Sequence, residues 1–137
     1  MTRVADRAWR LLQEARMDFD GRVVGIKASC DDRAPSLNYD QCFVRDFAVC
    51  APAFLLRGEH GIVRDFLITT LSLQSKRQAL EALEPREGLM PASFRPVQRD
   101  GATALEGDYG EESVARVTPV DSVFWWLLTL RAYCVVT

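Results

Sequence analysis

A short segment of the sequence concentrates polar and aromatic side chains of the kind that bind hydroxyl-rich molecules. It contains Asn38, Tyr39, Asp40 and Gln41, followed by Arg45 and Asp46. An aromatic ring offers a stacking surface, carboxylates accept hydrogen bonds and a guanidinium donates them, whereas each sugar hydroxyl needs both a donor and an acceptor. In a continuous helix, residues 38, 41 and 45 would share one face and residues 39, 43 and 46 another. Spacing alone favours a simpler interpretation, in which these residues cap a helix and form an exposed ion pair.

A second cluster lies near the end of the sequence, where Asp121 and Ser122 precede Trp125 and Trp126. Asp121 and Trp125 are four positions apart, so on a helix they share a face. A carboxylate beside an indole ring can hold a sugar by a hydrogen bond and by stacking. Spacing again favours a structural interpretation, in which Asp121 stabilises a helix N-terminus and the tryptophans belong to the core.

The residue types give little support for a metal site, a pair of catalytic acids, a phosphate-binding loop or a catalytic serine. His60 is the only histidine, and the cysteines at positions 30, 42, 50 and 134 form no Cys-x-x-Cys pair, so no metal site is expected. The adjacent acids Asp31-Asp32 and Glu111-Glu112 do not face one another and indicate solvated loops. The sequence has no glycine-rich phosphate loop and no Gly-x-Ser-x-Gly motif, and no cofactor is expected.

The composition is typical of an ordinary globular domain. The 137 residues are 48% hydrophobic, and 17 lysines and arginines against 19 acids give a net charge of −2. Without a basic excess, nucleic-acid binding has no electrostatic support. Residues 1–16 lack the apolar segment of a secretory signal, and the longest apolar run, at 123–130, is far shorter than the ~20 residues that span a membrane. The sequence therefore predicts a cytoplasmic protein with neither membrane nor nucleic-acid partners.

Hydrophobic periodicity predicts the helices that must position the two clusters. Helices are expected at residues 2–17, 41–57, 59–83 and 120–135. Asn38 or Asp40 would cap the second helix, because their short side chains accept hydrogen bonds from the first turn. Pro52 would kink or split that helix, and Gly58 would end it.

Long loops are expected between these helices, which makes the predicted chain mainly α with a small β-hairpin. Residues 18–37 are predicted to form a loop with one short strand at 22–26. The hairpin is expected at residues 94–98 and 103–105, joined by Asp100-Gly101, and Pro96 places it at a sheet edge. Thr118 would cap the last helix, with Pro119 as its first residue.

Four blocks of sequence carry a family resemblance. They are NYDQCFVRDF (38–47), GLMPASF (88–94), DYGEESVARVTPVDS (108–122) and FWWLLTLRAY (124–133). In this order they resemble the N-terminal part of the alkaline/neutral invertases, cytosolic-type glycoside hydrolases that split sucrose into glucose and fructose. The four blocks together are highly specific, although one alone would not be. Ala115 stands where the family tends to have glycine, a difference that leaves the resemblance intact.

The resemblance implies an (α/α)6 barrel with a sugar pocket at one end, and residues 1–137 would be the N-terminal fragment of this single catalytic domain. It also implies hydrolysis of sucrose with inversion, no metal or organic cofactor, and a homo-oligomer for the full-length protein. Eight residues match blocks near the pocket and are candidates for sugar binding: Tyr39, Asp40, Arg45, Asp46, Ser93, Phe94, Asp121 and Trp125. Four of them are expected to bind the hydroxyl groups of the sugar, namely Asp40, Arg45, Asp46 and Asp121.

No catalytic residue is assigned, because the general acid and base of this family are expected beyond Thr137. The chain alone is therefore expected to be inactive. One alternative is a non-catalytic helical sugar-binding or interaction module that keeps the pocket residues, and another is a nonfunctional remnant of the enzyme. A barrel cut after three or four helices would leave apolar surface exposed on the last helix, at residues 123–135.

Overall fold

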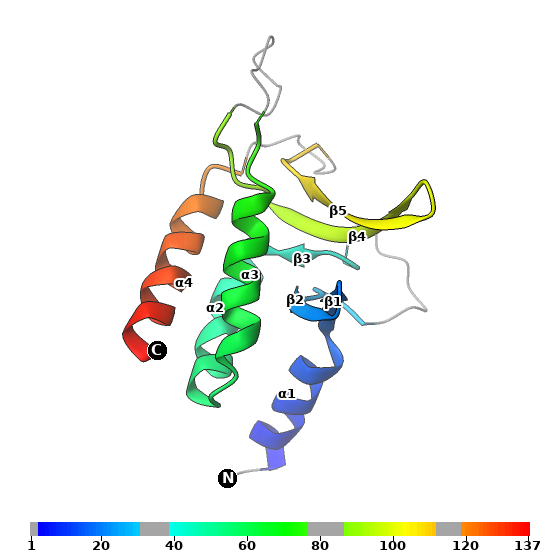
Figure 1. Ribbon diagram of the computed structural model, residues 1–137. Coiled ribbons are helices and arrows are strands. Elements are labelled where there is room, and N and C mark those ends of the chain that lie inside the picture. Colours follow the sequence, from blue (N-terminus) through cyan, green and yellow to red (C-terminus); the bar gives the residue numbers. More distant parts are fainter. Residues whose placement is uncertain (1–2, 31–38, 77–86, 112–118) are drawn as a thin grey trace.

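The computed structural model describes residues 3–30, 39–76, 87–111 and 119–137 (Figure 1). The helices in these ranges are α1 (Arg3–Glu14), α2 (Val44–Leu56), α3 (His60–Ser72) and α4 (Ser122–Val136). The strands are β1 (Arg16–Phe19), β2 (Arg22–Ile26), β3 (Cys42–Phe43), β4 (Ser93–Arg99) and β5 (Ala102–Asp108). The prediction of a mainly α chain with a small hairpin is confirmed for the described residues, whereas the (α/α)6 barrel stays a prediction.

Helices α2, α3 and α4 pack on one another, and the strands lie beside them (Figure 1). Strands β1 and β2 form an antiparallel hairpin that packs against α3. Strands β3, β4 and β5 form a separate antiparallel sheet in that order. In Figure 1, α1 extends from the β1–β2 hairpin away from the three-stranded sheet.

A set of aromatic rings joins these layers in the core. Phe47 of α2 and Phe66 of α3 stack with ring centroids 4.0 Å apart, and both are fully buried. Phe94 of β4 lies 6.2 Å from Phe66, and Phe54 of α2 lies 6.1 Å from Phe47. The ring of Trp9 reaches Phe54 at 5.3 Å, which attaches α1 to the same core although α1 has no fully buried residue. Burial of these rings is a main source of stability because aromatic side chains remove large apolar areas from water.

Both hairpins turn on the dipeptide Asp-Gly. Asp100 and Gly101 have φ of 51° and 80°, and Asp20 and Gly21 have φ of 50° and 72°. Positive φ at both central residues gives the turn whose twist matches that of a two-residue hairpin. The predicted hairpin at 94–105 is confirmed and extends to residues 93–108. The edge position predicted from Pro96 is wrong for β4, which lies between β3 and β5, although β3 pairs only with Ser93 and Phe94. The strand predicted at residues 22–26 within the loop at 18–37 is confirmed as β2, but residues 18–19 are not loop, because they belong to β1 and pair with β2.

Three predicted helices extend beyond the ends of the observed helices. Residues 15–17 leave the first helix, because Arg16 and Met17 pair with β2 instead. The third helix ends at Ser72 rather than at 83, and residues 77–83 lie outside the described ranges. Pro119 precedes α4, so it is not the first helical residue as predicted.

The start of α2 also differs from the prediction. Residues 41–43 are extended because Cys42 and Phe43 pair with β4, and the helix begins at Val44. Its N-cap is Phe43, with no side-chain cap, so the capping role predicted for Asp40 is wrong. The helical faces proposed for residues 38–46 are therefore wrong too. Asn38 and Thr118, the other predicted caps, lie outside the described residues.

The end of α2 follows the sequence closely. Gly58 has φ of 76° and donates its amide to the carbonyl of Leu55, which confirms the predicted glycine stop. The helix runs continuously through Pro52, so of the two predicted effects the split is wrong, and the kink stays a prediction.

Helix α4 exposes much of its apolar surface, as expected. The side chains of Phe124 and Leu128 are 64% and 58% exposed, and the other exposed apolar residues of this helix include Val123, Leu127, Val135 and Val136. In the described parts of the chain, no helix has the length and hydropathy needed to cross a lipid bilayer.

Candidate functional site

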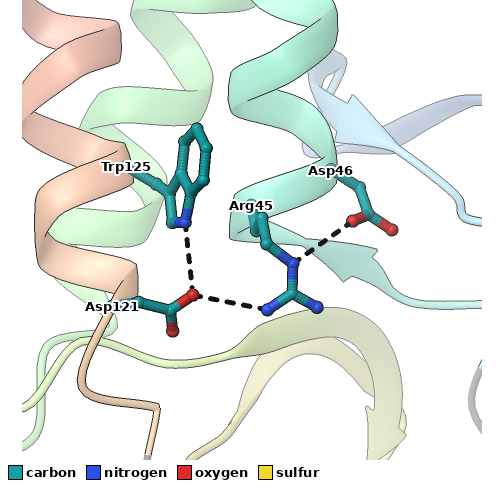
Figure 2. A network of polar contacts seen from close by, with 4 residues as sticks. All are labelled: Arg45, Asp46, Asp121 and Trp125. Carbon is teal, nitrogen blue, oxygen red and sulfur yellow. Dashed lines mark hydrogen bonds and ion pairs between the residues drawn. The ribbon is translucent and has the colours of Figure 1, made fainter.

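A cluster of polar side chains forms where the N-terminal ends of α2 and α4 meet (Figure 2). We call it the Arg45 cluster; it consists of Arg45, Asp46, Asp121 and Trp125. Arg45 and Asp46 belong to the first turn of α2, and Asp121 is the N-cap residue of α4. Packing of α2 against α4 brings together residues that are 76 positions apart in the sequence.

One carboxylate oxygen connects the cluster. Asp121 Oδ2 accepts a hydrogen bond from Arg45 Nη1 at 3.4 Å and another from Trp125 Nε1 at 3.2 Å. Arg45 Nε also lies 3.9 Å from Asp46 Oδ1 (Figure 2). The expected shared face of Asp121 and Trp125 is therefore confirmed. Both acids lie at helix N-termini, where the helix dipole favours negative charge.

The Arg45 cluster is open to solvent. The side chains of Arg45, Asp46 and Asp121 are 57%, 53% and 48% exposed. Ion pairs with this much exposure contribute little to stability, about 0–1 kcal/mol. Their donors and acceptors are thus accessible to a ligand, and loss of one of them should leave the fold intact.

Asp40 and Tyr39 lie just before β3, on the loop that leads toward the cluster. Asp40 Oδ1 lies 3.7 Å from Arg95 Nη1 on β4, and Tyr39 is 52% exposed. The backbone carbonyl of Tyr39 accepts a hydrogen bond from the amide of Ser29 at 2.8 Å, which holds this loop against the segment after β2. Arg95 is a partner that local spacing could not reveal, because Asp40 and Arg95 meet only through the pairing of β3 with β4.

The other two candidates, Ser93 and Phe94, are fully buried at the start of β4. Phe94 belongs to the aromatic core described above. Ser93 Oγ donates a hydrogen bond to Gln41 Oε1 at 2.5 Å, and Gln41 is itself only 2% exposed. The amide of Val44 donates to the carbonyl of Ala92 at 2.9 Å, so the residue just before β4 directly supports the start of α2.

Replacing Ser93 with alanine is expected to lower the free energy of unfolding by about 1–2 kcal/mol, because Gln41 Oε1 loses a buried donor. Urea denaturation followed by circular dichroism measures this change. The matched control is Ser72→Ala, which removes an exposed hydroxyl bonded to the carbonyl of Thr69 and should cost less than half as much. Equal losses in the two variants would contradict a supporting role for Ser93.

Trp126 points away from the cluster and has a structural role. Its Nε1 donates to the carbonyl of Leu67 on α3 at 3.1 Å. Both indoles are partly buried and pack against the core, as the structural interpretation predicts. They differ in their hydrogen bonds, since Trp126 ties α4 to α3 and Trp125 binds Asp121 of the Arg45 cluster. Sequence types alone could not separate them.

Two thiols near the cluster are poor nucleophiles. Burial raises the pKa of the Cys42 thiol to about 12, and burial also raises the pKa of Cys50, with a further contribution from Asp46 in each case. A thiol with a raised pKa stays protonated near neutral pH, and only the thiolate is reactive. Among the described residues, no three histidine, cysteine or acidic side chains are grouped so as to hold a metal ion.

Comparison with known proteins connects the whole chain to one family. Residues 8–137 match the family described as alkaline and neutral invertase. The chain is similar to probable alkaline/neutral invertase A, chloroplastic, of Arabidopsis thaliana, with 46% identity over 98% of this chain and 22% of the relative. It is also similar to two rice proteins, neutral/alkaline invertase 3, chloroplastic (47% identity; 95% of this chain and 23% of the relative), and cytosolic invertase 1 (45%; 92% and 23%).

The chain thus spans somewhat more than a fifth of the length of these relatives. Their names include chloroplastic, mitochondrial and cytosolic forms, so family membership alone does not assign a compartment. The matched region includes every residue of the Arg45 cluster, and it extends from before α2 to the end of α4. From the match to the family and from these relatives, the chain belongs to the alkaline and neutral invertase family.

Proposed function

We propose that this chain forms part of the sugar pocket of an invertase-type glycoside hydrolase, which hydrolyses sucrose to glucose and fructose with inversion. The Arg45 cluster is the central part of this pocket, and Tyr39 and Asp40 extend it. Ser93 and Phe94 are buried, and they contribute indirectly by supporting the start of α2. The observation that carries the proposal is the contact of Asp121 with both Arg45 and Trp125, because it brings residues of three family blocks together.

The chemistry of this surface suits a neutral sugar. Arg45 donates hydrogen bonds, the carboxylates of Asp46 and Asp121 accept them, and the indole of Trp125 offers an apolar face. A hydroxyl that bridges Arg45 and a carboxylate satisfies its donor and its acceptor at once. Charge-assisted hydrogen bonds of this type are roughly twice as strong as neutral ones.

The two catalytic carboxyl groups are proposed to lie elsewhere in the longer proteins of the family. An inverting hydrolase needs one protonated acid at the leaving oxygen and a second carboxylate beside a water molecule, about 6.5–9.5 Å away. Asp121 Oδ2 already faces two donors, which suits a fixed acceptor better than a proton donor. We therefore assign Asp121 to sugar binding and expect no sucrose hydrolysis by the 137-residue chain.

The exposed apolar face of α4 fits the (α/α)6 barrel proposed for the complete domain. Each helix of such a barrel packs against its neighbours, and α4 has apolar side chains for more contacts than α2 and α3 supply. The cytoplasmic location and the homo-oligomer expected for the full-length protein stay predictions.

Replacement of Arg45 with glutamine is expected to raise the dissociation constant for fructose or sucrose at least tenfold, which equals about 1.4 kcal/mol. The reason is that a charged donor is lost from the centre of the cluster. Isothermal titration calorimetry of the 137-residue chain measures the change, and a coupled glucose assay on the same samples tests for hydrolysis.

The matched control is Arg64→Gln on α3. Arg64 is 55% exposed, close to the 57% of Arg45, and it is likewise paired with the following aspartate. It should leave sugar affinity within twofold of the starting value. Equal affinities in the two variants would refute the sugar-binding role of Arg45, and glucose release above a buffer blank would refute the assignment of both catalytic acids to another part of the family's chain.

A further inference from the structure

A second polar pocket lies beside the β4–β5 hairpin, and the Arg45 cluster does not line it. Its volume is about 260 Å³, and we call it the hairpin pocket. Its walls are formed by Gln41, Arg95, Glu106, Gly107, Asp108 and Glu111. Pockets for drug-sized ligands usually span about 300–1,000 Å³, so this one is suited to a molecule about the size of a single monosaccharide.

Two polar side chains of this pocket are held in place by the fold. Gln41 is 98% buried, with Oε1 bound to Ser93, and Asp108 is only 8% exposed. Asp108 Oδ1 accepts hydrogen bonds from the amides of Gly110 and Glu111, at 2.9 and 2.8 Å. Side chains that are already positioned lose little conformational entropy when a ligand binds, which favours affinity.

Gly107 is a lining residue whose backbone packs closely against its neighbours. A Cβ atom at this position would lie 3.2 Å from Pro91 Cβ and 3.3 Å from Tyr109 Oη, which is tighter than ordinary van der Waals contact. The β5 backbone can therefore lie close to Pro91 and Tyr109 only because residue 107 has no side chain. Because Gly107 has no side chain, its backbone groups are also close enough to the pocket to contact a small ligand.

The charges of the lining select against anions. Among the described residues, the lining has three carboxylates, of Glu106, Asp108 and Glu111, and one cationic side chain, that of Arg95. Arg95 lies 3.7 Å from Asp40, and Glu106 is paired with Arg99, so counting these two neighbours still leaves more carboxylates than cations. An excess of carboxylates repels phosphates and sugar acids. Among the described residues these acids are not grouped as metal ligands, which disfavours a divalent cation. A neutral molecule that both donates and accepts hydrogen bonds remains the best match.

We propose that the hairpin pocket is a separate binding site for one neutral monosaccharide or polyol unit. Arg95 and the Gln41 amide supply donors, and the carboxylates of Glu106, Asp108 and Glu111 accept from hydroxyl groups. The proposal does not depend on the Arg45 cluster, because the lining shares no residue with it. The two sites can therefore be tested independently.

The test is an NMR titration of the 15N-labelled 137-residue chain with D-glucose, D-fructose and D-sorbitol. Saturable shifts are expected at the backbone amides of Gln41, Gly107 and Glu111 with at least one of these probes. Glucose 6-phosphate should bind at least fivefold more weakly than glucose at these amides, because its charge meets the carboxylates. No saturable shift at the three amides, or equal binding of the phosphate ester, would overturn the proposal.

Matched arginine variants sharpen the test. Arg95→Gln should raise the dissociation constant at the hairpin pocket at least fivefold, whereas Arg64→Gln should change it less than twofold, because Arg64 lies on α3 and outside this lining. Arg45→Gln should leave the shifts at the hairpin pocket unchanged even if it abolishes binding at the Arg45 cluster. Equal effects of Arg95→Gln and Arg64→Gln would overturn the assignment.

A third variant keeps the proposal testable if Arg95→Gln alters the folding of the hairpin. Glu111 is exposed, so Glu111→Gln should fold normally while it removes one charge from the lining. The ratio between glucose and glucose 6-phosphate affinities should then shrink by at least twofold. An unchanged ratio would contradict the role of these carboxylates in selecting a neutral ligand.

Discussion

Replacing Phe47 with alanine is expected to lower the free energy of unfolding by about 3–5 kcal/mol, the range seen when a buried phenylalanine is truncated. Phe47 is fully buried and contacts both neighbouring rings of the core, with centroids 4.0 Å from Phe66 and 6.1 Å from Phe54. Truncation would leave a cavity between α2 and α3 that the surrounding side chains cannot fill. Since a small domain is stable by only about 5–15 kcal/mol, much of the chain could be unfolded at 37 °C.

Urea denaturation followed by circular dichroism would measure this loss. The control is Phe124→Ala on α4, where the ring is 64% exposed and its removal should change stability by less than about 0.5 kcal/mol. Similar losses for both variants would mean that the Phe47–Phe66 stack is not the centre of the core. Loss of soluble Phe47→Ala protein, with normal yield of Phe124→Ala, would be the most severe form of the expected result.

Substitution of Gly25 with alanine is expected to cost about 2–3 kcal/mol, because it would overpack the contact between β2 and β3. A Cβ atom on Gly25 would lie 2.5 Å from Cys42 Sγ and 3.2 Å from Cys42 Cβ. Cys42 is fully buried and paired with Phe94, so neither the side chain nor the strand can move away easily. Thermal and urea denaturation would both report the loss.

Gly61→Ala is the matched control for this prediction. No atom lies within 4 Å of a Cβ at Gly61, and its position in the first turn of α3 favours alanine. This variant should be neutral or more stable. The double variant with Cys42→Ala should recover part of the Gly25→Ala loss, because the closest atom is removed; no recovery would mean that the strain arises elsewhere.

Local patterns predicted several elements well. Gly58 ends α2 because its positive φ suits glycine, and Asp100-Gly101 forms the hairpin turn because both residues accept positive φ. The same dipeptide at Asp20-Gly21 was a sufficient signal for the β1–β2 hairpin, which the expectation of a long loop overlooked. In each case the information lies within two to four residues.

Long-range contacts explain what local patterns missed. Residues 41–43 have a helix-like pattern of apolar residues, but pairing of Cys42 with Phe94 keeps them extended. The eight candidate residues also divide in a way that residue type could not show. Phe94 was a plausible stacking ring, yet it is fully buried in the core, whereas Trp125 packs against the core only in part and binds Asp121 with its indole nitrogen.

The sequence by itself determined the family, the mainly α character and the turns, because four conserved-type blocks and local backbone preferences are properties of neighbouring residues. Only the tertiary structure decided which candidates meet. Arg45 contacts Asp121 because α2 packs on α4, and Asp40 reaches Arg95 because β3 pairs with β4. It also revealed the hairpin pocket, whose walls come from the segment before β3 and from both strands of the hairpin. Such contacts depend on how apolar faces pack over the whole chain, and no spacing rule within one segment contains that information.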